Sequence, residues 1–427
     1  MISETCQHLL PSALLALLLV STPHPTGSAI EQLQNLQKEL RRTHANNDWH
    51  ANLAAATEQK DLLNGAPDSL VEVARAQLHI GDNDRAFDAL EQVAEMGQSE
   101  DLLAISKDFS ALVNHPRWQK LQNAFRANLS PRSLATTAFP LSDPALLAED
   151  VDYDPRTRRF FITSIREKKI IATTRAGSSI DFAKAPDNWP ILAIKVDSAR
   201  SVVWATEVAI EGLSFAPQSD WGRSAVLCFD LENGRLLRRI EGPHGTALGD
   251  MALAANGDVI VSDGDGGGLY RASQTGSQLT RLDDGDFISP QTPAFDPDGR
   301  HIFVPDYVRG IAQLELATKK VRWLPMEGKF ALNGIDGLYF DRGKLIAVQN
   351  GTSPERVVVF TLDPGLRKIT SEKIIERSTP TLDPTHGVIV DGDFFFIANS
   401  GWDSIDDKGN MKPGAKLSVP RLMQVRP

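Results

Sequence analysis

MALAANGDVIVSD, at residues 251–263, is one of six copies of a pattern that decides the fold of this chain. Each copy has the composition of two neighbouring β-strands joined by a tight turn, and its second strand ends in a polar residue. The other copies are VDYDPRTRRFFITS (151–164), LAIKVDSARSVVWAT (192–206), PAFDPDGRHIFVPD (293–306), GLYFDRGKLIAVQ (337–349) and GVIVDGDFFFIAN (387–399). Units that recur at about 40 to 60 residues with several strands each are typical of a β-propeller, so six copies predict six blades.

The propeller is predicted to occupy residues 135–427. A ring of blades must join its first and last strands, because an open edge would leave backbone groups unpaired. We therefore expect a strand at 137–141, which precedes the first copy, to pair with the carboxyl-terminal stretch 417–425.

The region before the propeller, residues 30–130, is predicted to be helical. Its apolar residues fall three and four positions apart, and Ala, Leu, Gln and Glu dominate its composition. The clearest helix pair spans 69–81 and 82–96, and we expect Asp68 or Ser69 to cap the first helix. The fold class is thus mainly β, with a small helical region in front.

This helix pair resembles a tetratricopeptide repeat. The small side chains of Ala74 and Ala86 allow the two helices to approach closely, and Leu70, Val73 and Leu90 fill the space between them. Such repeats bind peptides or other proteins, so the region is a candidate adaptor for a protein partner. Packing of the helices against the propeller is an equally open interpretation.

Residues 1–29 are expected to form a signal peptide. The apolar run LLPSALLALLLV at 9–20 is too short to span a bilayer, and Gly27-Ser28-Ala29 is suited to cleavage. This predicts a periplasmic or secreted protein with no membrane span after signal removal. The leading segment contains Glu4 and no basic residue, which leaves an intracellular apolar helix or a membrane anchor as alternatives.

The composition excludes two classes of function. The chain has 45 Lys and Arg against 55 Asp and Glu, a net charge of −10, so it lacks the positive field that holds nucleic acid. Its only two cysteines, Cys6 and Cys228, provide neither a disulfide framework nor a thiolate zinc cluster.

The β repeats resemble the senescence-marker-protein and gluconolactonase family, which includes regucalcin. The resemblance is strongest at ALNGIDGLYF (331–340) and SPQTPAFDPDG (289–299). It implies a six-bladed propeller that holds a divalent cation, often calcium, over its central channel. It also implies hydrolysis of a small molecule, a lactone or phosphoester, with one ligand Asp acting as the base that activates water.

The family's metal ligands are transferred to this sequence position by position. Glu149 matches the acidic ligand of the first blade, Asp336 matches the catalytic Asp, and Gln291 stands where the family has Asn. At a fourth position Gly249-Asp250 replaces Asn-Asp, so the amide is missing and a carboxylate remains. Because two of four positions depart from the family pattern, metal affinity is expected to be altered or absent.

The residue types support the same chemistry without the family. Calcium takes six to eight oxygen ligands, and loops from different blades converge at a propeller axis. Glu149, Gln291 and Asp336 are therefore predicted metal ligands, with Asp336 as general base. His386, which precedes the last copy, is predicted to be catalytic because imidazole titrates near neutral pH, and a hydrogen-bonded polar residue of the channel wall is the alternative. We assign substrate binding to Asp250 and to Trp189, although Trp402 is an alternative to Trp189 and both tryptophans can equally be packing residues.

Two functions remain open at this point. The first is a metal-dependent hydrolase of the lactonase type. The second is a non-enzymatic propeller that binds a ligand or protein and recruits partners through its helical region. A propeller hosts both classes, so the architecture does not choose between them.

Overall fold

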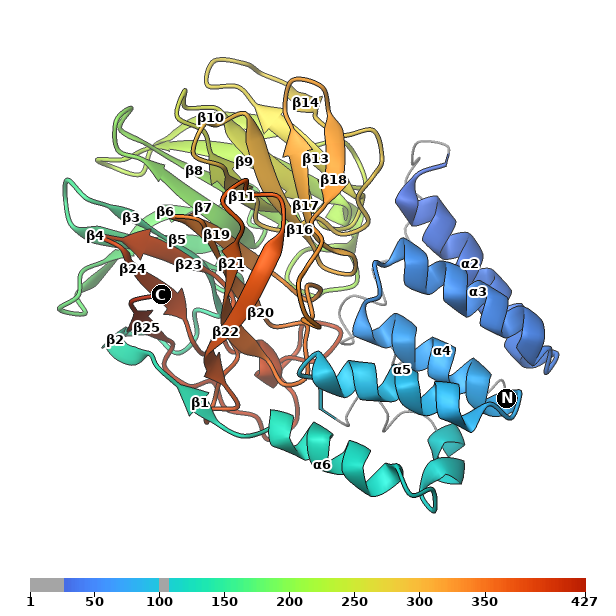
Figure 1. Ribbon diagram of the computed structural model, residues 1–427. Helices are drawn as coiled ribbons and strands as arrows, with labels where there is room; N and C mark the ends of the chain where they lie inside the picture. The colour runs from blue at the N-terminus through green and yellow to red at the C-terminus, as the bar shows by residue number, and fades with distance from the viewer. Residues whose placement is uncertain (1–26, 100–106) are drawn as a thin grey trace.

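The computed structural model describes residues 27–99 and 107–427, and it forms a β-propeller with a helical region beside it (Figure 1). The helices described are α2 (Ala29–Ala45), α3 (Trp49–Leu62), α4 (Pro67–His79), α5 (Asn83–Glu95), the 3-10 helix η2 (Lys107–Leu112) and α6 (Trp118–Asn128). Two short 3-10 helices follow in the propeller, η3 (Gln218–Asp220) and η4 (Trp402–Ser404). The predicted six-bladed fold is confirmed.

Six antiparallel sheets form the blades, and each predicted strand pair supplies the first two strands of one sheet. Blades 1 to 3 are β3 (Ala148–Asp154), β4 (Arg159–Ser164), β5 (Lys169–Thr173) and β6 (Ser179–Lys184); β7 (Ile191–Asp197), β8 (Val202–Ala209), β9 (Arg223–Asp230) and β10 (Leu236–Glu241); and β11 (Leu248–Leu253), β12 (Val259–Asp263), β13 (Gly268–Ala272) and β14 (Leu279–Arg281). Blades 4 and 5 are β15 (Ala294–Phe295), β16 (His301–Asp306), β17 (Gly310–Glu315) and β18 (Lys320–Trp323); and β19 (Gly337–Asp341), β20 (Lys344–Gln349), β21 (Arg356–Leu362) and β22 (Ile369–Arg377), to which β1 (Arg132–Ser133) adds a fifth strand.

Blade 6 closes the ring. It combines β23 (Gly387–Val390), β24 (Asp393–Ile397) and β25 (Arg421–Val425) with β2 (Thr136–Pro140), which comes from before the first blade. In the β2–β25 register, Thr137 pairs with Met423 and Pro140 with Arg421. This pairing confirms the predicted closure of the ring by the two ends of the β region.

The polar residue that ends the second strand of a blade ties the neighbouring loops together. Asp306 shows this most fully: one carboxylate oxygen accepts from the backbone N–H groups of Ile288 and Ser289, and the other accepts from those of Val308 and Arg309. Because an unpaired buried N–H is costly, a side chain that satisfies four of them fixes the loops at this end of the blade.

The helical region is built from antiparallel helices whose apolar faces pack together. Ala74 and Ala86 are completely buried where α4 meets α5, as the small side chains predict. The expected cap of the first helix is wrong: α4 begins at Pro67, and the Ser69 hydroxyl donates to the Ala66 carbonyl instead of accepting from the helix. Proline suits the first helical position because its missing N–H would be unsatisfied there anyway.

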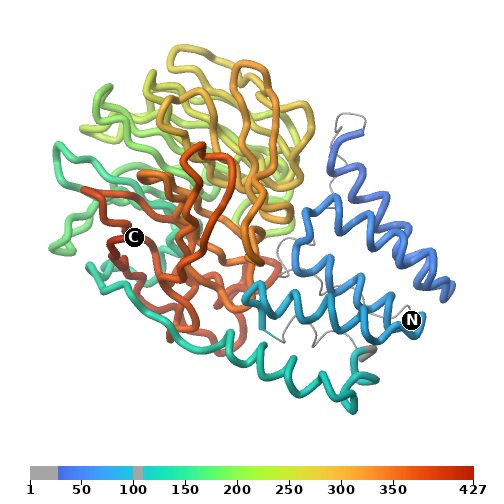
Figure 2. Tube along the Cα trace, viewed as in Figure 1, coloured from blue at the N-terminus to red at the C-terminus, as the bar shows by residue number. Residues whose placement is uncertain are grey.

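The helical region lies beside the propeller (Figure 2), and buried contacts hold it against blades 4 and 5. Ile30 and Leu33 of α2 pack with Ile288 and Val308 of the propeller. Arg356, the first residue of β21, is fully buried and lies 3.4 Å from the Met96 carbonyl oxygen at the end of α5. This arginine therefore reaches from the propeller to satisfy a helix carboxyl terminus.

Three sequence-based predictions are not decided here. Most of the expected signal peptide, residues 1–26, lies outside the described residues. The predicted domain limits and the tetratricopeptide assignment of the helices stay predictions. None of the helices described is both long and apolar enough to cross a membrane.

Candidate functional site

Three of the side chains singled out from the sequence meet at the propeller axis. Ligand atoms of Glu149, Asp336 and His386 all lie within 4.8 Å of one another. Glu149 belongs to the first strand of blade 1, and the other two residues directly precede the first strands of blades 5 and 6. With Asp250 from blade 3, which His386 contacts, we call these four residues the axial group.

Backbone irregularities place two members of the axial group. The β3–β4 register shifts between Ala148 and Val151, and the β11–β12 register shifts between Leu248 and Asp250. A β-bulge redirects the side chains next to it, so Glu149 and Asp250 leave the regular alternation of their strands at the point where these strands begin. The first strands of neighbouring blades also contact each other, which brings their starting residues around one axis.

His386 lies at the centre of the axial group and is 2% exposed. Its Nε2 is 2.7 Å from Asp250 Oδ1, and its Nδ1 is 3.1 Å from the Glu149 carbonyl oxygen. A carbonyl oxygen and a carboxylate can only accept, so both ring nitrogens donate and the imidazole is cationic. Burial opposes that charge, but the carboxylates of Asp336 and Asp250 outweigh it and raise the pKa of His386 well above its ordinary value.

In each of the carboxylates of Glu149 and Asp336, one of the two oxygens accepts a hydrogen bond from a protein donor. Glu149 Oε2 accepts from the Trp402 indole N–H at 2.7 Å, and Asp336 Oδ2 accepts from the Asn350 amide at 2.7 Å. Among the described residues, no hydrogen bond reaches Glu149 Oε1 or Asp336 Oδ1, and His386 Nε2 lies 3.7 Å from the latter. The group thus presents oxygens that are oriented but not satisfied.

Burial changes the acidity of both carboxyl groups. It raises the pKa of Glu149 to about 8, and the neighbouring Asp336 charge adds to the effect. Burial also raises the pKa of Asp336 to about 6, and Asp250 adds to this while the His386 cation opposes it. A carboxylate with a pKa close to neutrality is suited to take up and release a proton.

Two other predicted residues have different surroundings. The Gln291 amide donates to Ser289 Oγ at 3.0 Å, and no described hydrogen bond joins it to the axial group. Trp189 is 1% exposed, and its indole donates to Asp220 Oδ2 at 3.1 Å. Through these contacts the Gln291 amide fixes a loop and the Trp189 ring packs inside the protein. Neither contact tests the predicted role of Gln291 in metal binding or of Trp189 in substrate binding, and both roles stay predictions.

The structure adds residues that the sequence analysis did not assign to the site. Thr292, next to Gln291, donates to Asp250 Oδ1 at 2.7 Å. Asn350 follows the polar end of the fifth repeat by one residue, and Tyr307 follows that of the fourth; their side chains are 3.1 Å apart. A search for polar residues directly after each second strand would have found Asn350 and Tyr307. Trp402, the alternative to Trp189, is the tryptophan that contacts the axial group.

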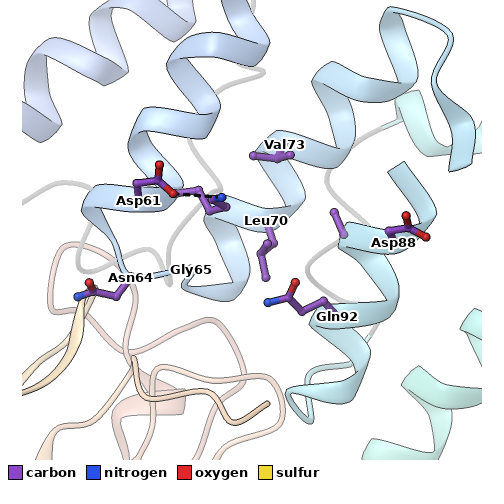
Figure 3. A pocket seen from close by; sticks show the side chains of 9 residues that line it. Asp61, Asn64, Gly65, Leu70, Val73, Asp88 and Gln92 are labelled. Carbon is purple, nitrogen blue, oxygen red and sulfur yellow. Dashed lines mark ion pairs between the residues drawn. The ribbon is translucent and has the colours of Figure 1, made fainter. Parts of the chain in front are cut away.

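The helical region contains a concave feature (Figure 3). Leu70 and Val73 of α4, with side chains of α3 and α5, line a groove of about 470 Å³. Polar residues surround it, among them Lys60 and Asp61, whose side chains form an ion pair at 3.1 Å. We call this feature the helical groove; it is where a protein partner would bind under the adaptor hypothesis.

Comparison with known proteins returns structures of similar fold. A gluconolactonase from Xanthomonas campestris is 15% identical, with 69% of this chain and 89% of that chain covered and a TM-score of 0.48. A virginiamycin B lyase from Staphylococcus aureus is 13% identical, with 61% and 80% covered and a TM-score of 0.45. An aldose sugar dehydrogenase with bound PQQ from Streptomyces coelicolor is 12% identical, with 69% and 97% covered and a TM-score of 0.47.

No protein-family model and no curated protein matches the chain. At the identities and TM-scores above, the similar structures carry no argument about activity. The six-bladed assignment therefore rests on the strand pairing, and any assignment of function rests on the axial group.

Proposed function

We propose that the protein is a hydrolase that cleaves a lactone or ester at the axial group, with a divalent cation as cofactor. The observation that supports this most directly is the meeting of Glu149, Asp336 and His386 from three blades within 4.8 Å. A carboxylate of near-neutral pKa beside a buried imidazolium is an acid–base pair suited to hydrolysis.

The donor atoms present fit a divalent cation in part. Glu149 Oε1 and Asp336 Oδ1 would hold it, because each belongs to a carboxylate whose other oxygen is already fixed by a protein donor. Both ring nitrogens of His386 carry a proton, so the imidazolium has no lone pair to offer the cation, and we assign it a proton-carrying role instead. Oxygen donors favour calcium, magnesium or manganese, and calcium remains our first candidate. When bound, such a cation supplies Lewis-acid polarisation of a carbonyl.

The side chains of this chain would divide the proton transfers between them. Asp336 takes a proton from the attacking water as the new C–O bond forms. His386 exchanges its Nε2 hydrogen bond to Asp250 for one to the leaving oxygen and gives that oxygen its proton as the old C–O bond breaks. The side chains of Asp336 and His386 approach within 3.7 Å, so the proton can pass back from the carboxyl group to the imidazole and restore both groups. Asp250 and Thr292 position the imidazole, and Asn350 positions the Asp336 carboxylate.

The test is a lactone- and ester-hydrolysis assay with added Ca²⁺ or Mn²⁺ on wild type and Asp336→Asn. Loss of the general base is expected to lower kcat/KM by about 10²- to 10⁴-fold. Asp341→Asn is the matched control, because Asp341 ends β19, the strand that Asp336 directly precedes, and its side chain pairs with Arg342. Equal activity in Asp336→Asn and Asp341→Asn would refute the assignment.

The alternative is a non-enzymatic binding protein that recruits a protein partner through the helical groove. The groove of about 470 Å³ between α3, α4 and α5 is the observation that favours it. A charged substitution on its floor, Val73→Asp, would then abolish recovery of a partner from cell extract and leave any hydrolysis unchanged. A partner set that is identical for wild type and this variant would count against the adaptor.

A further inference from the structure

The central channel contains a cavity of about 280 Å³ next to the axial group. Its walls come from the first strands of blades 1, 2, 3, 5 and 6 and from the blade 4 segment that contains β15. Thr292 lines the cavity and also donates to Asp250, and Gly387, the residue after His386, lines it as well. None of the four axial residues lines the cavity itself, but it adjoins the group through Thr292, which contacts Asp250, and through Gly387, which follows His386.

The cavity has one polar end. The Thr292 hydroxyl is already used on Asp250, and the Tyr339 hydroxyl accepts from the Gly387 N–H at 2.7 Å. Lys195 Nζ pairs with Asp150 at 2.9 Å, and Asp152 Oδ2 accepts from the Val196 N–H. Most polar atoms at this end therefore already have protein partners.

The remaining wall is apolar. Leu253, Phe295, Leu338, Phe340, Val388 and Ile389 all line the cavity. Sugar hydroxyl groups that entered such a space would lose their water without gaining partners, which disfavours a polyhydroxylated ligand. Methylene groups gain affinity in the same place, because apolar surface leaves water.

We propose that this cavity binds an aliphatic chain, so that the substrate is a lactone or ester with a hydrocarbon tail and not a sugar lactone. The reacting carbonyl then lies at the axial group and the tail extends along the channel. This inference rests on the proposed function for the identity of the carbonyl group, whereas the chain-binding cavity stands on its own residues. A volume of about 280 Å³ is close to the lower end of cavities that bind small molecules, and a single unbranched tail is suited to it.

The experiment is calorimetric titration of the full chain with γ-lactams of increasing alkyl length. Lactams mimic the lactone ring and resist hydrolysis, so binding is measured even if the protein is not a hydrolase. The affinity is expected to rise about fourfold per added CH₂ until the chain fills the cavity. A polyhydroxylated lactam is expected to bind more weakly than any of the alkyl series.

Substitutions in the cavity make the test specific. Leu253→Trp is expected to weaken binding of the long-chain lactam at least about tenfold, while Leu237→Trp on the exposed face of β10 leaves it unchanged. If Leu253→Trp does not fold, Ile389→Ala replaces it, with an expected loss of several-fold from the missing wall contacts.

The outcomes separate this inference from the proposed function. Affinity that is independent of chain length, or a preference for the polyhydroxylated lactam, would overturn the inference even if lactones are hydrolysed. Chain-dependent binding that Leu253→Trp weakens supports it. If the protein then hydrolyses no lactone or ester, the proposed hydrolase fails and the chain-binding cavity stands.

Discussion

At the scale of single residues, His386 organises the axial group. Both of its ring nitrogens donate, one to Asp250 and one to the Glu149 backbone, so it joins blades 1, 3 and 6 through one cation. The sequence indicated His386 and Asp250 as separate candidates with different roles. Their contact was not predictable, because it depends on where two loops far apart in the chain place their side chains.

The His386–Asp250 pair gives a prediction about pH. In the metal-free protein His386 should still be protonated at neutral pH, and Asp250→Asn should lower its pKa. A raised pKa contributes stability that is fully present below the unfolded value near 6.5 and is lost as pH rises through the folded value. At pH 6 we expect Asp250→Asn to cost about 2–3 kcal/mol in free energy of unfolding, because a buried charge loses its partner.

Nuclear magnetic resonance titration of the imidazole and urea unfolding at pH 6 check this prediction. Asp296→Asn is the control, because Asp296 forms a comparable pair with His301 on a blade 4 turn. The His386 titration should not change in that variant. A His386 pKa that is the same in wild type and Asp250→Asn would show that the pair does not set its charge.

At the scale of elements, the strand that closes the ring has the clearest energetic role. Phe139 of β2 is 3% exposed and packs against Phe160, with ring centroids 5.1 Å apart. The strand itself was predictable, since the apolar pattern and the need to pair the last blade left few choices. The register of β2 on β25, which contains a bulge between Thr137 and Phe139, was not predictable from pattern alone.

Replacement of Phe139, the buried side chain of β2, by a smaller residue should destabilise the whole propeller. We expect Phe139→Ala to cost about 3–5 kcal/mol in unfolding free energy, measured by urea denaturation. Thr137→Ala, at an exposed position of the same strand, should cost less than about 1 kcal/mol. Equal losses for the two variants would contradict the view that β2 acts through its buried side.

Most of the site residues that could not be predicted from the sequence lie in turns and loops. The six strand pairs were predictable because a two-residue alternation repeats with polar ends. Thr292 and Asn350 were not assigned to the site, and Trp402 was only an alternative to Trp189, because the directions of these side chains depend on loops. Gln291 shows the same limit: its chain position matched a ligand, yet its amide donates to Ser289.

At the scale of the whole molecule, the helical region and the propeller are joined by buried polar contacts. Arg356 is fully buried, donates to Gln349 Oε1 at 2.8 Å and reaches the Met96 carbonyl at the end of α5. Exposed pairs such as Lys329 with Glu95 add little, since surface ion pairs contribute weakly. The sequence predicted both parts but not how they dock, because Arg356 has no pattern that marks it as an interface residue.

Substitution of this arginine should loosen the interface. Arg356→Ala removes the guanidinium that donates to the carbonyl groups of Met96 and Gly97 and leaves Met96 only the Gln98 amide, so hydrogen exchange in α5 should accelerate at least about tenfold. Lys329→Ala, at the exposed pair, is the control and should leave that exchange unchanged. Protection in α5 that is identical in wild type and Arg356→Ala would contradict the docking role.

The most direct test of the central claim is calorimetric titration of the metal-free protein with Ca²⁺ and Mn²⁺. The account predicts one cation per chain and an affinity that falls at least about tenfold in Glu149→Gln, because a charged ligand is lost. Glu232→Gln, at an exposed turn, should bind as wild type does. Absence of binding in wild type, or equal binding in Glu149→Gln, would contradict a cation held by the axial group.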